Sequence, residues 1–349
     1  MSVSARLSEY DFELPPALIA AEPAPTRDGS RLMVVSKGGA APLQHRRFPE
    51  LVELLAPGSV LVLNETRVIP ARFLGRRPSG GKVELLLVRP HPDGGWEALV
   101  RSGKPVRPPD ERLELEDGRA RARVLAKLGP GRYRVELSGG AQDDAADALE
   151  LAERVGRIPL PPYIARQERP ADRERYQTVF ARVPGAIAAP TAGLHFTPEL
   201  LARVEARGVT LARVLLHVGP GTFAPIREDD LSAHRMESER YQVPAPARAL
   251  IEAARAEGRP VVACGTTAVR ALESWAHTGQ AEGDTELFIR PGHEFRAVDQ
   301  LITNFHLPRS TLLLLVSALA GREPILAAYR EAVARGYRFY SYGDAMLIR

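Results

Sequence analysis

The sequence predicts an α/β protein: a larger α/β domain built from the N- and C-terminal segments, with an inserted antiparallel β-barrel domain. From Val209 to the end, helical and extended patterns alternate, whereas between about Val68 and Gly140 short β-rich stretches are separated by Gly, Pro and Asp turns. Because α/β patterns flank the β-rich region on both sides, we expect the α/β domain to span 1–67 and 150–349 and the barrel domain to span 68–149.

The first clear α/β unit begins at Thr197, which we expect to cap a helix with Pro198 at its first position. Leu200, Leu201 and Val204 form the apolar stripe of this helix, and a glycine follows its end. The segment VTLARVLLHV then predicts a buried strand that ends in the loop GPGTF.

A second unit repeats this order. It consists of a helix over about 247–257, the strand PVVAC, and a GTT turn that opens the helix AVRALESWA. The run LPRSTLLLLVSALAGREPILAAYREAVARG predicts two more helices, separated at Gly321 and Pro324 and closed by Gly336. Repetition of helix and strand in this way favours a sheet covered by helices.

The β-rich region contains the stretches KVELLLVRP, GWEALVRS, RLELED, RARVLAKL and GRYRVELS, with turns such as HPDGG, EDG and GPG between them. Antiparallel hairpins fit these stretches best. The segment AQDDAADALELAERVG is expected to be the linker that returns to the α/β domain.

Composition excludes several classes of protein. The 349 residues are 44% apolar and 26% charged, as in ordinary soluble globular proteins. The longest apolar run, Leu312 to Ala320, is about half of a membrane span, and the N-terminus lacks an apolar signal core. We therefore expect a cytoplasmic protein without a membrane partner. Its only cysteine, Cys264, excludes an intramolecular disulfide.

The net charge is +4, and the basic residues are almost all arginine. Arginine binds phosphate bidentately, so the composition is compatible with an anionic partner such as RNA. A general bias of the source genome toward arginine accounts for it equally well, and charge alone does not establish nucleic-acid binding.

Three histidines indicate chemistry. His195 lies in PTAGLHF, where Thr191 precedes it, His217 lies in LLHVGPGTF, and His306 lies in TNFHLP, where Asn304 precedes it. The pKa of an unperturbed imidazole is about 6.5, so histidine exchanges protons near neutral pH. A lone histidine in an apolar segment is usually structural, but three such segments favour an enzyme site in the α/β domain, which we therefore expect to be the catalytic one.

Two Gly-rich turns follow predicted strands. In GPGTF, Gly219, Gly221 and Thr222 would allow a backbone to approach a sugar, carboxylate or phosphate, although a plain turn explains the motif equally well. In CGTT, Gly265, Thr266 and Thr267 open a helix and could bind an anion, with Arg270 adding charge one turn later. The alternative for the second turn is a simple helix cap.

NETR, at the end of the strand SVLVL, places Asn64 and Arg67 at a domain junction, where either a pocket or an interdomain salt bridge is expected. His234 and Glu237 lie three residues apart, which is not the HExxH spacing of a zinc protease. The sequence therefore predicts no metal site.

A longer set of segments resembles one family. The segments are FELPPALIA with TRDGSRLMVV, VLNETRVIPARF, RIPLPPYI, RYQTVF, APTAGLHFTPELL, LLHVGPGTF, GTTAVRALES, LITNFHLPRSTLLLLVSALAG and YRFYSYGDAM. Together they are similar to the S-adenosylmethionine:tRNA ribosyltransferase-isomerases of queuosine biosynthesis, over about Phe12 to Ile348.

The resemblance implies a reaction. The family moves the ribosyl part of S-adenosylmethionine onto the aminomethyl group of 7-aminomethyl-7-deazaguanine at the tRNA wobble position and isomerises it to an epoxycyclopentanediol, releasing adenine and methionine. This chemistry requires a base, an acid and a neutral amine nucleophile. S-adenosylmethionine is consumed as a substrate, and because its sulfonium makes both the acidity and the leaving group, no metal or other cofactor is expected. The implied partners are S-adenosylmethionine and the tRNA anticodon loop, and the chain is expected to be a monomer.

Residue roles are also implied by the resemblance. His217 or His306 is expected to be the base and His195 or Glu237 the acid, while Asn64 and Arg67 orient ribose or the target base. The turn 265–267 would hold the methionine carboxylate, with Arg270 nearby. Gly219, Gly221 and Thr222 would hold the sugar or adenine, and Thr191 and Asn304 belong to the binding motifs.

Three positions depart from the pattern expected of the family. Glu65 stands in place of Asp, Glu237 in place of a second His after the Met, and His293 in place of a Tyr after Pro-Gly. Two other functions stay open from the residues alone. One is a glycosyl or phosphoribosyl transferase that acts on small molecules without RNA, and the other is an RNA-binding module whose histidines are structural.

Overall fold

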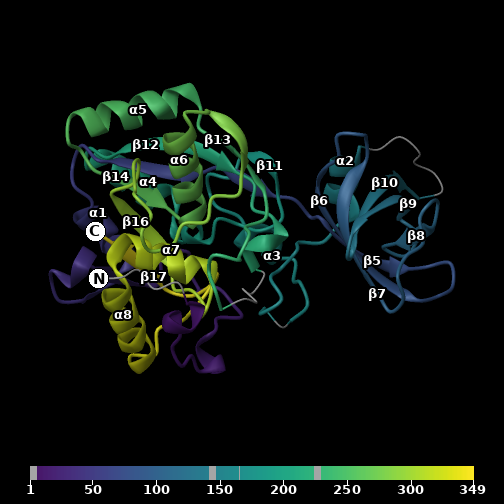
Figure 1. The fold of residues 1–349 in the computed structure, drawn as a ribbon, viewed down its shortest axis with the longest axis horizontal. Coiled ribbons are helices and arrows are strands. Elements are labelled where there is room, and N and C mark those ends of the chain that lie inside the picture. Colours follow the sequence, from purple (N-terminus) through teal and green to yellow (C-terminus); the bar gives the residue numbers. More distant parts are fainter. Residues whose placement is uncertain (1–5, 141–146, 165, 224–228) are drawn as a thin grey trace.

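The computed structural model describes residues 6–140, 147–164, 166–223 and 229–349. Its ribbon has two parts, a mixed α/β part and a β-barrel at one end of the long axis (Figure 1). The predicted fold class is therefore confirmed.

A nine-stranded sheet forms the centre of the α/β part, in the order β15-β13-β12-β3-β14-β16-β17-β1-β2. Its strands are β1 (Arg31–Val35), β2 (Gln44–Arg47), β3 (Val60–Asn64), β12 (Thr210–Leu216), β13 (Glu239–Gln242), β14 (Val261–Cys264), β15 (Glu282–Thr285), β16 (Gln300–Asn304) and β17 (Ala345–Ile348). Strands β12, β3, β14 and β16 are mutually parallel, and Val62 pairs with both Ala212 and Ala263. Their carboxyl ends therefore lie at one edge of the sheet, the usual place for a ligand in such folds.

Helices cover both faces of the sheet because successive strand residues point to opposite sides. Val60 and Val62 belong to a core shared with α5 (Ala245–Ala256), α6 (Thr266–Thr278), α7 (Thr311–Ala320) and α8 (Arg322–Ala334). Leu61 and Leu63 instead pack with α1 (Leu51–Leu54) and α4 (Pro198–Ala206). The sheet therefore has a separate hydrophobic core on each of its two faces.

The observed helix boundaries lie close to the predicted ones. Thr197 caps α4, and its hydroxyl accepts a hydrogen bond from the backbone of Leu200 at 3.1 Å. Helix α6 begins at Thr266, earlier than predicted, because the GTT turn itself forms the first helical turn after Gly265, whose φ is 89°. Gly321 separates α7 from α8 as expected.

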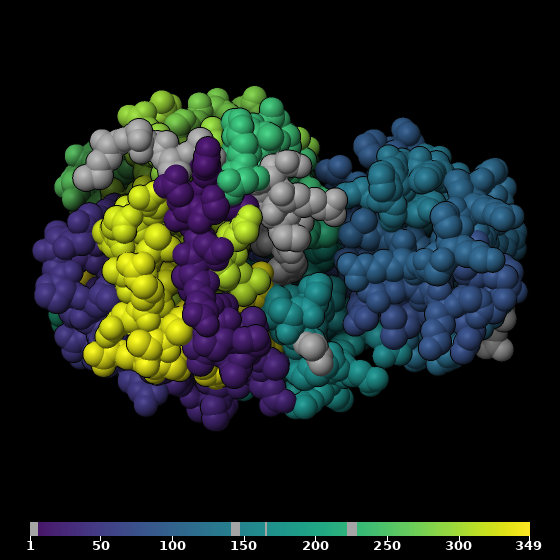
Figure 2. All heavy atoms as spheres, turned by 60° about the horizontal axis from the view of Figure 1, so that its bottom comes forward, coloured from purple at the N-terminus to yellow at the C-terminus, as the bar shows by residue number. Residues whose placement is uncertain are grey.

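Short elements connect these layers. They are η1 (Leu7–Tyr10), η2 (Pro16–Leu18), η3 (Lys37–Gly39), η4 (Phe48–Glu50), η5 (Thr191–His195), η6 (Pro220–Phe223), α3 (Asp172–Arg175) and the parallel pair β4 (Thr66–Val68) and β11 (Val183–Ala186). The N-terminal segment lies across the C-terminal residues (Figure 2), and the ring of Phe12 stands 5.1 Å from that of Tyr329 between centroids. This contact ties the two ends of the sequence into one core.

Six antiparallel strands form the closed barrel, in the order β10-β7-β6-β5-β8-β9. They are β5 (Arg72–Arg76), β6 (Lys82–Pro90), β7 (Trp96–Ser102), β8 (Arg112–Leu115), β9 (Ala120–Gly129) and β10 (Arg132–Gly139). The five predicted stretches are all strands. Strand β5 was not predicted, because its sequence RFLGR has few apolar residues and a glycine that packs directly against the backbone of β8.

The predicted linker needs a correction. Residues Ala148–Val155 form helix α2, which Asp147 caps by accepting from the backbone N–H of Leu149. Leu151 and Ala152 are buried in the barrel core, so the apolar side of this helix closes onto the barrel. The earlier part of the linker, 141–146, lies outside the described residues. The domain boundaries at 67/68 and 149/150 stay a prediction.

Among the helices of the described residues, none alone is long and apolar enough to cross a membrane; α7 and α8 reach that length only as a pair bent by 117°.

Candidate active site

A pocket opens at the carboxyl ends of the four parallel strands. Its empty space is about 510 Å³, part of which is continuous with solvent. The lining residues come from the ends of β12, β14 and β16, from η5 and its approach, from the starts of α6 and α7, and from the segment before β17. They are Ala188, Ala189, Pro190, Thr191, Ala192, Val218, Gly265, Thr266, Thr267, Thr303, Asn304, His306, Leu312, Tyr340 and Ser341. Segments far apart in sequence therefore meet here, as the fold class predicts.

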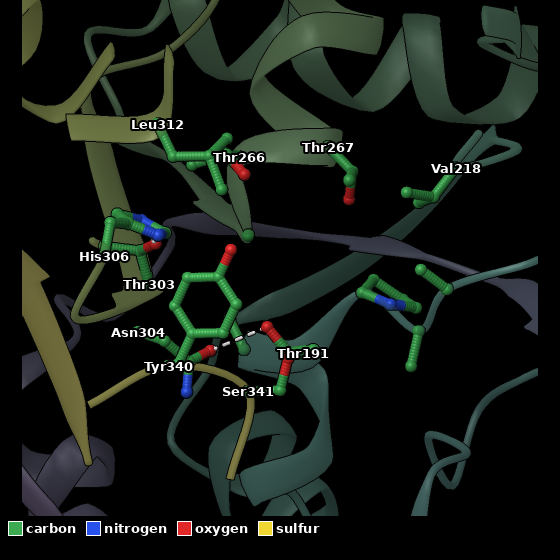
Figure 3. Close-up of a pocket in the computed structure, with 15 residues that line it drawn as sticks. Thr191, Val218, Thr266, Thr267, Thr303, Asn304, His306, Leu312, Tyr340 and Ser341 are labelled. Carbon is green, nitrogen blue, oxygen red and sulfur yellow. Dashed lines mark hydrogen bonds between the residues drawn. The ribbon is translucent and has the colours of Figure 1, made fainter. Parts of the chain in front are cut away.

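Hydroxyl groups dominate the polar lining. Figure 3 shows the hydroxyls of Thr266, Thr267 and Tyr340 facing a common space, with His306 beside them. Thr266 and Thr267 are the first residues of α6, where backbone N–H groups have no helical partner and the helix dipole favours negative charge. This end of the pocket can bind an anionic group such as a carboxylate.

Thr191 and His195 are connected through Asn304. Thr191 Oγ1 donates to Oδ1 of Asn304 at 3.0 Å, and Nδ2 of Asn304 lies 3.1 Å from Nε2 of His195. An amide nitrogen can only donate, so Nε2 of His195 accepts and the ring proton is on Nδ1. Nδ1 lies 2.9 Å from Oγ of Ser30, which accepts that proton.

Both ring nitrogens of His195 are therefore occupied, and the imidazole lies behind the pocket wall rather than on it. Burial lowers the pKa of His195 to about 4, which keeps the ring neutral near pH 7. In this state His195 bonds to Asn304, which in turn accepts from the hydroxyl of Thr191. The role of His195 as an acid stays a prediction.

His306 lies on the pocket wall itself. Its Nε2 is 2.9 Å from Oγ1 of Thr303, and its backbone N–H donates to the hydroxyl of Tyr329. Burial lowers the pKa of His306 to about 3, so the ring is a neutral imidazole at physiological pH. A neutral imidazole beside a ligand cavity can accept a proton.

His217 follows β12 and adjoins the pocket through Val218. Its Nδ1 is 2.8 Å from Oγ1 of Thr66. The ring packs flat against Gly185, where a Cβ would lie 2.6 Å from a ring carbon, so this position accepts only glycine. Burial, and then the charge of Arg240, lowers the pKa of His217. His217 is thus a second neutral imidazole at the same sheet edge.

Asn64 joins strand ends to helix α6. Its Nδ2 donates to the carbonyl of Leu216 at 3.0 Å and to Oγ1 of Thr267 at 3.1 Å. Its Oδ1 accepts from the backbone N–H groups of Thr66 and Leu216. Asn64 therefore holds Thr267 in place, and its contact with a ligand stays a prediction.

The neighbouring Glu65 is buried and pairs with Arg182 at 2.9 Å. Its other carboxylate oxygen, Oε2, is buried without a hydrogen-bond partner. The residue expected here from the family pattern is the shorter Asp, so this chain carries one extra methylene at a tightly packed junction.

Arg270 is buried and already paired. Its guanidinium forms a buried ion pair with Glu239 and donates to the carbonyls of Leu287 and Thr285, and its contribution of charge to the CGTT turn stays a prediction. Burial lowers the pKa of Arg270 to about 10. Glu239 also accepts from the backbone N–H of Gly219 at 2.9 Å, so the pair supports the start of the GPGTF loop.

The described part of the GPGTF loop, residues 219–221, does not line the pocket. Gly221 packs against Glu237, where a Cβ would lie 2.7 Å from the Glu237 side chain. The side chain of Thr222 lies outside the described residues. Binding of a sugar or adenine by this loop stays a prediction.

Glu237 and Arg67 also lie away from the pocket. Glu237 is exposed and pairs with Arg132 of the barrel at 2.5 Å. Arg67 pairs with Glu153 of α2 at 2.7 Å. Both residues therefore bridge the α/β part to the barrel side of the molecule, which is the salt-bridge alternative that the sequence left open at NETR.

Tyr340 and Ser341 line the pocket but were not predicted as site residues. Tyr340 has a φ of 74°, in the left-handed region that a non-glycine residue rarely adopts. Burial raises the pKa of its hydroxyl to about 12, which keeps it protonated and able to donate. The signal was present in YRFYSYGDAM, which belongs to the resemblance, but nothing in the local pattern indicates a ligand.

The pocket lies at strand ends, has polar groups at a helix N-terminus and has two neutral imidazoles at the same sheet edge. This arrangement is that of an α/β enzyme whose pocket can bind an anionic group. A family profile described as queuosine biosynthesis protein matches residues 7–348. The chain therefore belongs to this family.

Individual relatives are similar in sequence to this chain over nearly its full length. A protein of Anaeromyxobacter dehalogenans (strain 2CP-C), named S-adenosylmethionine:tRNA ribosyltransferase-isomerase, is 58% identical and covers 98% of this chain and 99% of its own. A protein of the same name from Thermus thermophilus is 51% identical, covering 98% and 99%. The crystal structure of an S-adenosylmethionine tRNA ribosyltransferase from Thermotoga maritima is 40% identical, with a TM-score of 0.56 over 98% of this chain and 100% of that chain.

Proposed function

We propose that the chain is an S-adenosylmethionine:tRNA ribosyltransferase-isomerase. It transfers the ribosyl part of S-adenosylmethionine to 7-aminomethyl-7-deazaguanine at the tRNA wobble position, isomerises it, and yields epoxyqueuosine-tRNA, adenine and methionine. The observation that carries this proposal is the identity of 58% and 51% to proteins of that name over nearly the full length of both chains.

The chemistry begins at the sulfonium. It acidifies the proton on the adjacent ribose carbon, and a base removes that proton. The electron pair left on that carbon, C5′, forms a C4′–C5′ double bond as the C4′–O4′ bond breaks, the O4′ electrons form a carbonyl at C1′, and adenine leaves with the electron pair of its C1′–N bond and is protonated by an acid. The amine then adds to C4′ and loses a proton, which returns an electron pair to C5′. C5′ bonds to C1′, and the resulting alkoxide displaces methionine from C5′, with the electron pair of the carbon–sulfur bond, to close the epoxide. His306 on the pocket wall, and His217 next to Val218, are the candidates for the base, because burial keeps both rings neutral and leaves a ring nitrogen that can accept a proton.

Thr266 and Thr267 are the proposed site for the methionine carboxylate. They line the pocket at the start of α6, where the helix dipole favours negative charge. Thr191 and Asn304 supply polar contacts to the ribose, and His195 keeps them oriented. The hydroxyl of Tyr340 is the remaining protonated donor on the wall.

The barrel is the proposed surface for the tRNA anticodon loop. Residues 72–139 contain fifteen Lys and Arg against nine Asp and Glu, whereas the rest of the chain has a slight excess of acidic residues. Phosphate backbones bind where positive charge is concentrated. The proposal includes a cytoplasmic location, where tRNA and S-adenosylmethionine are both available, and a monomeric enzyme.

The test is adenine release. The protein is incubated with S-adenosylmethionine and tRNA that carries 7-aminomethyl-7-deazaguanine, and adenine is quantified by chromatography. Release that requires the precursor-modified tRNA supports the proposal. Release with a free small acceptor, or tight tRNA binding without any release, overturns it in favour of a small-molecule transferase or an RNA-binding module, respectively.

A further inference from the structure

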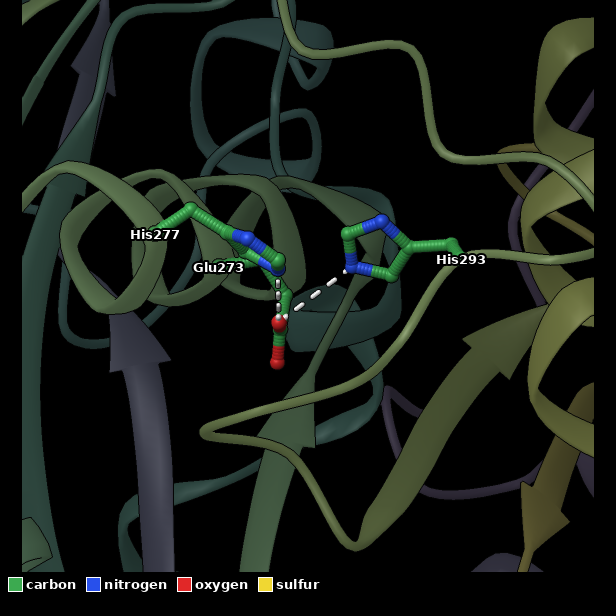
Figure 4. Close-up of side chains that lie close together, drawn as sticks. All are labelled: Glu273, His277 and His293. Carbon is green, nitrogen blue, oxygen red and sulfur yellow. Dashed lines mark hydrogen bonds and ion pairs between the residues drawn. The ribbon is translucent and has the colours of Figure 1, made fainter.

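Three metal-ligating side chains converge on the far half of helix α6, outside the pocket. Glu273 and His277 lie one turn apart on the helix, and His293 comes from the loop between β15 and β16 (Figure 4). One ligand atom from each of the three lies within 4.8 Å of the others. None of these residues takes part in the proposed ribosyl transfer.

Both imidazoles direct a nitrogen to the same carboxylate oxygen. Nε2 of His293 is 3.3 Å and Nε2 of His277 is 3.6 Å from Oε2 of Glu273. A divalent metal bound at about 2.0–2.1 Å to tetrahedral ligands keeps those ligands about 3.3 Å apart. Two of the three edges of such a site are therefore already formed.

The charge of Glu273 is the second argument. The carboxylate is fully buried, and among the described residues its ion pairs are with His277 and His293 and with no Lys or Arg. A buried carboxylate that pairs with no Lys or Arg is a suitable anionic ligand for a divalent ion.

The carboxylate is also held in a fixed orientation. Oε1 accepts from the backbone N–H groups of Ala297 and Val298, and Oε2 accepts from that of Arg296 at 2.9 Å. Such outer contacts are what orients a ligand in metal sites. His277 is partly exposed, which leaves an entry path and room for water as a fourth ligand. The Nε2 of His277 lies 3.1 Å from the carbonyl oxygen of Glu294, and it would exchange this contact for the ion.

We propose that Glu273, His277 and His293 form a binding site for Zn²⁺ or a similar divalent transition-metal ion. Two imidazole nitrogens and one carboxylate oxygen suit zinc, whereas Mg²⁺ and Ca²⁺ prefer all-oxygen sites. The ion links α6 to the segment 293–298 and stabilises the helix whose first turn lines the pocket.

The test uses the untagged full-length protein after dialysis against a chelator. Zn²⁺ alone is titrated by calorimetry, and Co²⁺ is used as a spectroscopic probe of coordination. We expect one Zn²⁺ per chain with a Kd of about 1 µM or tighter, a higher Tm with Zn²⁺, and the visible absorption of tetrahedral Co²⁺.

The main variant is His293→Tyr, which keeps an aromatic ring against Phe295, whose centroid is 4.9 Å away, and removes the ligand nitrogen. Zn²⁺ affinity should fall at least about 100-fold in this variant and in His277→Gln, with the circular dichroism spectrum unchanged. His91→Gln, in the barrel, should bind Zn²⁺ as the parent does. Absence of stoichiometric binding in the parent, or equal binding in His293→Tyr and the parent, would overturn the proposal. None of these readouts depends on ribosyl transfer.

Discussion

Nδ2 of Asn304 lies 3.1 Å from Nε2 of His195, so an amide on the pocket wall fixes the tautomer of an imidazole behind that wall. The same amide accepts from the hydroxyl of Thr191 at 3.0 Å. The order of the pocket's polar groups therefore depends on a buried residue, His195, that does not line the pocket.

This relationship predicts the effect of Asn304→Ala. The substitution leaves Nε2 of His195 buried without its donor and frees the hydroxyl of Thr191. We expect the free energy of unfolding to fall by about 1–3 kcal/mol and kcat to fall by about 10–100-fold. Urea unfolding and adenine release measure the two effects. Thr191→Ser is the matched control and should keep most of the activity, whereas Thr191→Val should not; equal rates for the two Thr191 variants would contradict the assignment.

His306 and His217 are the proposed proton acceptors. If either removes the ribose proton, His306→Gln or His217→Gln should lower turnover at least about 100-fold, with little change in the KM for S-adenosylmethionine. Single-turnover adenine release measures the chemical step directly. Near-parent rates for both variants, with folding intact, would remove the assignment.

Stability should depend on pH through the buried imidazoles. Burial lowers the pKa of His195 to about 4 and that of His306 to about 3, whereas both are about 6.5 in the unfolded chain. Between these values the unfolded chain binds more protons, so the free energy of unfolding rises with pH. The contribution of each buried histidine to the free energy of unfolding is complete above pH 6.5 or so. It is lost as the pH falls toward 4, with a slope of about 1.4 kcal/mol per pH unit for each histidine.

Urea unfolding at several pH values between about 7.5 and 5 measures this slope. His306→Gln should reduce the slope by roughly its own share of about 1.4 kcal/mol per unit. His91→Gln, in a turn at the edge of the barrel, is the control and should leave the slope unchanged. An identical slope in His306→Gln and the parent would show that His306 titrates normally.

Local patterns were sufficient for most of the fold. The alternation of helix and strand, the cap at Thr197 and the turns of the barrel are signals that involve residues close together in sequence. Strand β5 and helix α2 were missed because their faces are complete only after packing onto the barrel. His306, Thr266 and Thr267, each predicted as a site residue, line one pocket because the strand ends of a parallel sheet coincide.

Side-chain pairings over long separations could not be predicted. Arg270 meets Glu239 only because β13 joins the sheet beside β12, next to helix α6. Tyr340 reaches the pocket through a backbone conformation that its sequence does not indicate. The connection from Ser30 to His195 spans 165 residues and has no local signature.

The pair of Arg270 and Glu239 predicts a large stability effect. Glu239→Gln leaves a buried guanidinium without its counter-charge, so we expect the free energy of unfolding to fall by about 3–5 kcal/mol. Glu282→Gln removes an exposed carboxylate that contacts Gln242, and it should cost less than about 0.5 kcal/mol. Chemical unfolding of the two variants is the comparison. A small effect of Glu239→Gln would mean that water or another group satisfies Arg270.

Charge reversal on the barrel tests the proposed tRNA surface. Lys82 and Arg101 are exposed and line the same groove of the barrel. The double variant Lys82→Glu/Arg101→Glu should raise the KM for tRNA at least about 10-fold. It should not change the KM for S-adenosylmethionine. The dependence of log affinity on log salt should also become shallower, by about 0.7–0.9 for each phosphate that the variant no longer neutralises. Arg203→Glu, an exposed reversal on α4 of the α/β part, is the control for net charge. Arg203→Glu is compared with Lys82→Glu and Arg101→Glu made singly. If Arg203→Glu weakens tRNA binding as much as either of them, the effect is one of overall charge and the barrel is not the docking surface.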